Sequence, residues 1–183
     1  MTYFTKLLTI LMALAVTFQA QAQQRDFKQS ETQIQAVVES FRTAIIEKDK
    51  PRFLALFHGM AIPWLAVNED GSLAKMRKRN PDTSKADPIG TPGPDAFIDF
   101  VMNAPMPIEE KFSNIRVTTD GMIASVFFDY SFHQGDYKSN WGTEAWQLVN
   151  TESGWKINSV IYSIEYNPLP PTPKKNNAEK SVK

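Results

Sequence analysis

The clearest pattern in this chain is the alternation of apolar and polar residues in its C-terminal third. From Met122 to Phe132 the sequence reads M-I-A-S-V-F-F-D-Y-S-F. Successive side chains of a strand point to opposite faces, so this pattern predicts a strand with one core-facing side. Asp129 and His133 are expected to face outward. The predicted core face comprises Ala124, Val126, Phe128, Tyr130 and Phe132.

Three further strands are predicted around this one, over residues 112–118, 141–149 and 155–166, with turn residues between them. Asp-Gly at 120–121 is a strong hairpin signal, so the four strands form an antiparallel meander. In the third strand Trp146 and Leu148 share a face with Glu144. The last strand is partly apolar on both faces, which predicts a bulge or two-sided burial without deciding which face is inside.

Helical spacing dominates the chain upstream of the meander. Apolar residues recur every three or four positions from Ile34 to Ile45, after a capping box that begins at Ser30. Pro51 suits the start of a second helix, which ends at His58-Gly59. A short strand over 60–67 contains Pro63, which places it at a sheet edge. A third helix is predicted over 94–103.

Residues 68–93 form a long loop or flap rich in Pro and Gly, with a basic run from Lys75 to Arg79. A short helix over 72–79 is one interpretation of this segment. Long irregular segments in compact domains are either lids or mobile excursions. The base rate favours a solvated, disordered insertion, and the basic run is interpreted as a solvated face rather than an anion site.

The two ends of the chain are predicted to lie outside the domain. Lys6, an apolar run over 7–16 and the motif Ala20-Gln21-Ala22 predict a signal peptide over 1–22, with a retained N-terminal anchor as the alternative. The protein is therefore expected to be exported, either periplasmic or secreted, with no membrane span after cleavage. Residues 23–29 are expected to be flexible, and the Pro- and Lys-rich tail over 167–183 disordered.

Composition restricts the chemistry. The chain has no cysteine and only two histidines, His58 and His133, so disulfides are excluded and neither a metal nor another cofactor is expected. No Ser-His-Asp spacing or phosphate-binding glycine loop is present. Without its tail and Lys6 the chain is mildly acidic, which argues against a nucleic-acid partner.

Three stretches together resemble a known family: residues 34–57, residues 123–132, and residues 144–149 with 154–157. They are similar to nuclear transport factor 2-like proteins, which include SnoaL-like and ketosteroid-isomerase-like domains. The resemblance implies an α+β fold over 30–166, in which a cone-shaped, curved antiparallel sheet packs against about three N-terminal helices. It also implies a possible homodimer through the outer sheet face, where Ile123, Phe127 and Trp141 would lie. The isomerase's tyrosine and paired aspartates have no match, so no catalytic role is transferred.

The predicted ligand pocket centres on one carboxylate among aromatic residues. A desolvated Glu144 could act as a general acid or base, Tyr130 could stabilise an oxyanion, and His58 could shuttle protons. Structural alternatives exist for each residue, including an ion pair of Glu144 with Arg42 or Lys156. The pocket residues are Trp64, Phe128, Tyr130, Glu144, Trp146 and Tyr162, with His58 near the mouth.

Three functions fit these observations. The sequence favours a domain that binds a small apolar or amphipathic ligand over an enzyme, because an aromatic inner face surrounds a single carboxylate. The first alternative is a cofactor-free acid–base enzyme, of the isomerase or dehydratase kind, using Glu144. The second is a non-catalytic dimerisation module whose filled core leaves no pocket.

Overall fold

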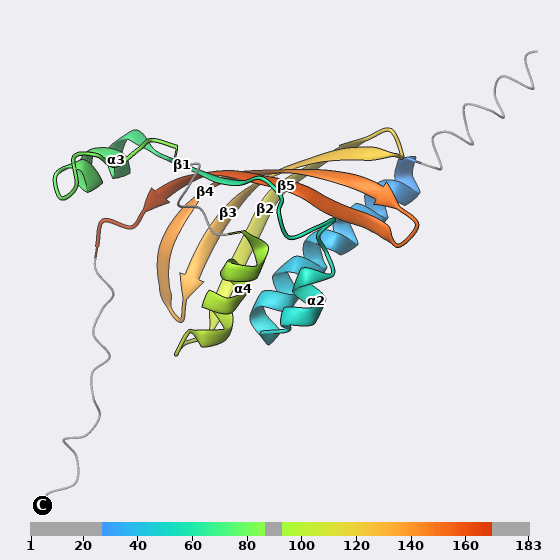
Figure 1. The fold of residues 1–183 in the computed structure, drawn as a ribbon, viewed down its shortest axis with the longest axis horizontal. Helices are drawn as coiled ribbons and strands as arrows, with labels where there is room; N and C mark the ends of the chain where they lie inside the picture. Colours follow the sequence, from blue (N-terminus) through green and yellow to red (C-terminus); the bar gives the residue numbers. More distant parts are fainter. Residues whose placement is uncertain (1–26, 87–92, 170–183) are drawn as a thin grey trace, which may run out of the picture.

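The computed structural model describes residues 27–86 and 93–169, which form one curved sheet with helices against one face (Figure 1). The strand order is β1-β5-β4-β3-β2. The α+β architecture predicted from the sequence is confirmed. The strands are β1 (Trp64–Asn68), β2 (Ile108–Thr119), β3 (Ile123–Gln134), β4 (Tyr137–Thr151) and β5 (Gly154–Tyr166). The helices are a first helix over residues 27–47, α2 (Lys50–Leu54), α3 (Asp70–Arg77) and α4 (Pro94–Asn103).

The sheet is mixed, whereas the sequence predicted an antiparallel one. Strands β2 to β5 form the expected antiparallel meander. Strand β1 instead runs parallel to β5, from Trp64 opposite Val160 to Asn68 opposite Ile164. It lies at the sheet edge, as predicted, but starts only after Pro63, which has no N–H for the ladder. Alternation within a strand carries no information about the direction of its neighbour.

Turns and bulges shape the meander. The Asp120 carboxylate accepts the N–H groups of Met122 and Ile123, both at 2.9 Å, and Gly121 adopts a φ of +92°. Such a φ favours glycine, so the predicted hairpin is confirmed. Register shifts interrupt the β2/β3, β3/β4 and β4/β5 ladders. The shift opposite Gln147 moves β5 by one residue, which buries Trp155 and Ile157 before it and residues 160 and 164 after it.

The first helix buries the apolar stripe that its spacing predicted, from Ile34 to Ile45. It is already helical at residue 27, so Ser30 lies inside the helix, and the expected flexible segment 23–29 is wrong for residues 27–29. A capping-box sequence can also occur within a helix, which explains the error. The start of α2 matches its prediction, because the Asp49 side chain accepts the Arg52 N–H at 3.0 Å.

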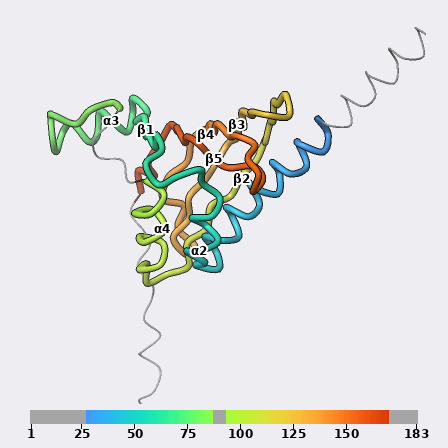
Figure 2. The backbone as a smooth tube through the Cα atoms, turned by 45° about the vertical axis from the view of Figure 1, so that its right-hand side comes forward, coloured from blue at the N-terminus to red at the C-terminus, as the bar shows by residue number. Residues whose placement is uncertain are grey.

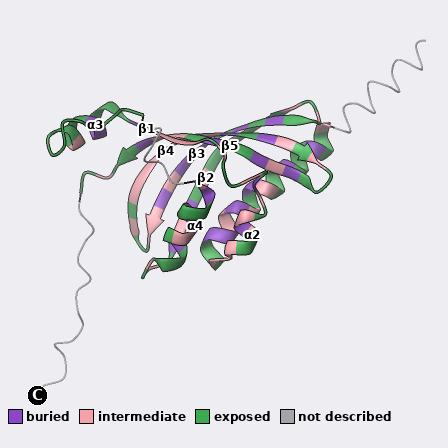
Figure 3. Ribbon diagram, in the orientation of Figure 1, coloured by how far each residue is buried: buried purple, intermediate pink, exposed green. Residues whose placement is uncertain are grey.

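The core lies between these helices and the inner face of the sheet, which together form the cone (Figure 3). The Phe41 ring packs at 4.7 Å from that of Trp146 and at 4.8 Å from that of Phe53. The buried face of β3 is the predicted one, from Ala124 to Phe132. None of the helices in the described ranges is long and apolar enough to cross a membrane.

The flap does not match its interpretation as a disordered insertion. Residues 68–86 leave the end of β1 and project beyond the sheet as α3 and a return segment (Figure 2). The backbone N–H of Asn68 donates to the Lys85 carbonyl at 2.8 Å, and the Glu69 N–H donates to Ile164 of β5 at 3.0 Å. Backbone hydrogen bonds therefore fasten this part of the flap to the sheet. Residues 87–92 lie outside the described part of the chain.

The tail also begins later than predicted. Asn167 donates its backbone N–H to the Ser139 carbonyl at 2.9 Å, and Tyr137 donates its hydroxyl to the Leu169 carbonyl at 2.7 Å. Residues 167–169 thus continue along the sheet. The predicted signal peptide over 1–22 and the rest of the tail fall outside the described residues.

Candidate functional site

Glu144 lies on the inner face of β4, between Phe128 on β3 and Tyr162 on β5. Its side chain is buried, with a relative exposure of 4% for the residue. The Trp146 indole N–H donates to Glu144 Oε1 at 2.6 Å. In the described ranges no cation pairs with this carboxyl, and both proposed cationic partners bond elsewhere. Arg42 binds Glu39 at 2.7 Å, and Lys156 donates to the Ala55 carbonyl at 2.6 Å.

A second buried carboxyl, Glu110, faces the same cone. Strand β2 begins at Ile108, four residues before its predicted start, so alternation places Glu110 on the inner face together with Phe112. Glu110 is 6% exposed and, within the part of the chain that the structure describes, has no ion-pair partner. The sequence reasoning missed it because the strand was started at Phe112. Counting the alternation backwards from Phe112 would have found it.

The two carboxyls influence one another across β3. Burial raises the pKa of Glu144 to about 7, and the hydrogen bond from Trp146 opposes this rise only in part. Burial also raises the pKa of Glu110 well above its usual value, and the charge of Glu144 raises it further. Two like charges in one apolar site resist simultaneous ionisation, so the pair keeps at least one proton near neutral pH.

Tyr130 lies between the two carboxyls on the inner face of β3. Burial raises the pKa of its hydroxyl, and the charges of Glu144 and Glu110 raise it further. The Tyr130 side chain crosses Gly142, its partner on β4, and the hydroxyl donates to the Ser163 carbonyl at 3.0 Å. A Cβ at Gly142 would lie 2.0 Å from that same oxygen. Gly142 therefore permits a close approach of β4 and β5 that gives Tyr130 its acceptor.

The predicted pocket residues divide into a floor and a mouth. Phe128 and Trp146 form the floor, because both are fully buried and their rings pack perpendicular at 5.0 Å. Tyr162 and Trp64 are only partly buried, and these two residues are here called the mouth. The Tyr162 ring meets that of Tyr130 edge-on at 5.9 Å, and Trp64 packs 5.5 Å from Phe97. The structure thus brings the predicted sheet residues together on the inner face, where Glu144 lies between Phe128 and Tyr162.

His58 does not join this group. Its side chain is exposed, and its backbone N–H donates to the Ile157 carbonyl at 2.9 Å in the turn after α2. The described hydrogen bonds do not link it to Glu144. The role proposed for it in proton transfer therefore has no support in the geometry.

The outer face of the sheet carries the other predicted residues. Asp129 accepts a hydrogen bond from Asn114 at 2.7 Å, and Trp141 donates its indole N–H to Glu165 at 3.1 Å. Ile123 and Phe127 are exposed there. These positions agree with the predicted facing, and the homodimer through this face stays a prediction.

Two cavities are found outside the cone floor. One, of about 440 Å³, lies against β2, β3 and β4 and includes Lys111, Asp129 and Trp141 among its lining residues. The other, of about 540 Å³, lies between α3 and the end of β5. Within the described ranges, no group of three or more His, Asp or Glu side chains could hold a metal ion.

Comparison with solved structures agrees with this geometry. An NTF2-like protein of unknown function from Shewanella baltica superposes with a TM-score of 0.52 at 17% identity, covering 77% of this chain and 98% of the other. A second NTF2-like protein, from Silicibacter pomeroyi, gives 0.51 at 18% identity, with coverages of 76% and 98%. This chain has the nuclear transport factor 2-like fold.

A third solved structure, named LinA, superposes with a TM-score of 0.57 at 16% identity, covering 82% of this chain and 96% of that one. No family model and no curated protein matches the sequence. Identities of this size show the fold alone, and one fold supports many functions. The function must therefore be argued from the carboxyl pair and its surroundings.

Proposed function

We propose that the cone binds a small amphipathic molecule, whose apolar body lies among the aromatic residues of the mouth and whose hydrogen-bond donor contacts the carboxyl pair. The observation that supports this proposal is the burial of Glu110 and Glu144 without a cation among the described residues. Pockets of this kind combine an apolar lining with a few converging polar groups.

The energetic argument concerns the cost of this pair. A buried carboxyl that lacks a cation or several donors destabilises the folded protein, and two such groups in one site add mutual repulsion. The Trp146 indole supplies one donor to Glu144. A ligand hydroxyl, amine or amide would supply another, so binding would offset part of a cost that folding alone leaves uncompensated. Perturbed carboxyls of this kind concentrate at functional sites.

The ligand should therefore carry a donor at one end of an apolar body. A matched probe series is naphthalene, 2-naphthol and 1-naphthylmethylamine, which share a ring system and differ in the donor. We expect the hydroxyl and amine probes to raise the melting temperature saturably, and naphthalene to do so less. The Met106 methyl resonance should move with them, since Met106 packs against the core two residues before β2.

Glu144→Gln tests the site, and Glu152→Gln in the exposed β4–β5 turn is its matched control. We expect Glu144→Gln to weaken the amine probe about tenfold or more, because a charge-assisted hydrogen bond contributes roughly 1.5–3 kcal/mol. The control should bind as the wild type does. The proposal is wrong if no probe shifts the melting temperature. It is also wrong if the Glu144→Gln variant binds all three probes as tightly as the wild type does.

A second candidate is a cofactor-free acid–base enzyme, favoured by the pKa of about 7 for Glu144. A carboxyl that titrates near neutral pH can both accept and return a proton in one cycle. Glu144 would be the proton carrier, because burial raises its pKa. For any substrate that the ligand series identifies, turnover unchanged by Glu144→Gln would exclude this role.

Export also belongs to the proposal, since it depends on residues 1–22 alone. The sequence of the mature N-terminus, determined on protein from the cell envelope or medium, should begin just after Ala22. An N-terminus that still carries residues 1–22 would contradict it.

A further inference from the structure

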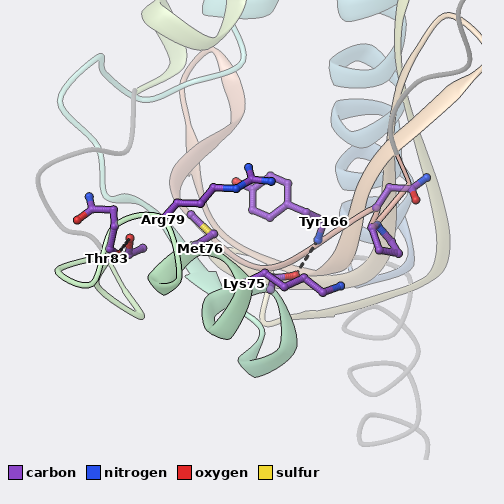
Figure 4. Close-up of a pocket in the computed structure, with 9 residues that line it drawn as sticks. Lys75, Met76, Arg79, Thr83 and Tyr166 are labelled. Atoms are coloured by element: carbon purple, nitrogen blue, oxygen red, sulfur yellow. Dashed lines mark hydrogen bonds between the residues drawn. The ribbon is translucent and has the colours of Figure 1, made fainter.

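The cavity between α3 and the end of β5, here called the flap cavity, has about 540 Å³ of space, within the range of small-molecule sites. Figure 4 shows Lys75 and Met76 on α3, and Arg79 in the turn that follows it, beside the strand end that carries Tyr166. Thr83, on the return segment of the flap, lines the cavity as well. Nothing in the function proposed for the cone uses this space.

Hydrogen bonds hold the walls of the flap cavity in place. The buried Ser72 hydroxyl accepts the Tyr166 backbone N–H at 3.0 Å, which ties α3 to β5. The Arg77 side chain donates to the Thr83 carbonyl at 3.0 Å and so joins α3 to the return segment. These bonds join α3 to β5 and to the return segment, so hydrogen bonds fix the walls of the cavity relative to one another.

The charge on the cavity wall has one sign. Lys75 lies on α3 and Arg79 in the turn two residues past its end, and both line the cavity. Neither has an ion-pair partner in the described part of the chain, and no Asp or Glu occurs among the residues that line the cavity. Of the neighbouring cations, Lys85 pairs with Asp70 at 2.6 Å and Lys78 does not line the cavity. Lys75 and Arg79 are therefore the cations that the cavity offers to a ligand.

We infer that the flap cavity binds a small amphipathic carboxylate, with its head group between Lys75 and Arg79 and its apolar body against Met76 and Tyr166. A planar guanidinium and an ammonium that line the same cavity suit a carboxylate, which accepts charge-assisted hydrogen bonds from both. The thioether and the aromatic ring provide the apolar contact. The cone has the opposite preference, because its carboxyl pair repels anions.

The test uses decanoate as the probe and decanol as its uncharged match, with the methionine methyl groups labelled with ¹³C. Met76 reports on the flap cavity and Met106 on the cone, and Met76→Leu assigns the resonance. We expect decanoate to move the Met76 signal saturably and to leave Met106 unchanged, whereas decanol leaves Met76 unchanged. Inorganic phosphate, a head group without a body, should bind more weakly than decanoate.

The variant Lys75→Gln/Arg79→Gln should weaken decanoate binding about tenfold, because it removes two charge-assisted bonds, although each contributes less at an exposed position than it would in a buried site. The control Lys28→Gln/Lys78→Gln removes the same charge from exposed positions that do not line the cavity, and should bind as the wild type does. Raising the salt concentration should weaken binding only where both cations remain.

Three results would overturn the inference: no Met76 shift at millimolar decanoate, an equal shift with decanol, or equal affinity in the two double variants. A shift at Met106 without one at Met76 would place decanoate in the cone and would also overturn it. Failure of the naphthalene series at the cone leaves the Met76 result untouched, so the two proposals fail separately.

Discussion

The two halves of the inner sheet face differ although the same strands build both. Toward the β2–β3 and β4–β5 turns the face is wholly apolar, with Ala124, Val126, Leu148 and Ile157 all buried in the core. Toward the other end the same alternation presents Glu110, Tyr130, Gly142, Glu144 and Tyr162. The first half is covered by helices and stabilises the fold. The second half holds carboxyls at a cost in stability, and this is the reason that we propose it as the binding site.

The largest effect is expected in the apolar half, from Phe41→Ala. Its ring is buried and packs against Phe53 and Trp146, so removing it leaves a cavity. We expect the free energy of unfolding in urea to fall by about 3–5 kcal/mol. Phe100→Ala, at a half-exposed position on α4, should cost less than about 1 kcal/mol. Similar losses in the two variants would contradict the assignment of this half as the core.

The next effect concerns the carboxyl half and depends on pH. The pKa of Glu144 rises from 4.5 to about 7 on folding, so the folded state binds more protons than the unfolded state between these values. Stability is therefore highest below about pH 4.5 for this group and is lost as the pH rises to about 7, by roughly 3 kcal/mol at most. Glu144→Gln should remove this loss, and should be more stable than the wild type at pH 7.5.

Urea unfolding between pH 5 and 7.5 would measure this pH-dependent loss of stability, with Glu152→Gln as the control. The lowered pKa of His133 acts in the opposite sense over the same range, because its folded state binds fewer protons. The difference between wild type and variant removes that contribution. A difference that stays constant over this range would show that Glu144 is ionised in the folded protein.

The smallest of the three effects is expected at the close approach of β4 and β5. In Gly142→Ala the new Cβ would meet the Ser163 carbonyl oxygen at 2.0 Å, so the strands must separate and the hydrogen bond from Tyr130 must lengthen. We expect a loss of about 1–3 kcal/mol and a changed near-ultraviolet circular dichroism signal. Gly71→Ala in α3 meets no atom within 4 Å and should be neutral or slightly stabilising. Equal stability of the two variants would contradict the close approach.

Much of the cone followed from local patterns. Alternation placed Phe128, Tyr130 and Glu144 on one face, and the helical stripe around Phe41 predicted what covers it. These patterns work because side-chain direction depends only on the local backbone. The prediction of a pocket around Glu144 rested on this parity alone, and the structure brings the named sheet residues together.

Other parts depended on contacts that local patterns do not encode. Glu110 was missed because the start of a strand depends on its partner, and β3 extends the pairing back to Ile108. The flap was interpreted as disordered because long irregular segments usually are, yet long-range hydrogen bonds at Ser72 and Glu69 fasten it to β5. The sequence suggested Arg42 or Lys156 as an ion-pair partner of Glu144 because of their charge alone, and both side chains bind elsewhere.

By itself the sequence determined which side chains share a face of a strand, where the chain turns, and which side of each helix is apolar. Each of these properties follows from a few neighbouring residues. Only the tertiary structure decided that two carboxyls from different strands occupy one apolar space. It also decided that α3 lies against the end of β5 and lines a cavity there. Burial and charge proximity are properties of chain segments far apart in sequence. They set the pKa of a carboxyl and the partners of a cation, and so they decide which residues can bind a ligand.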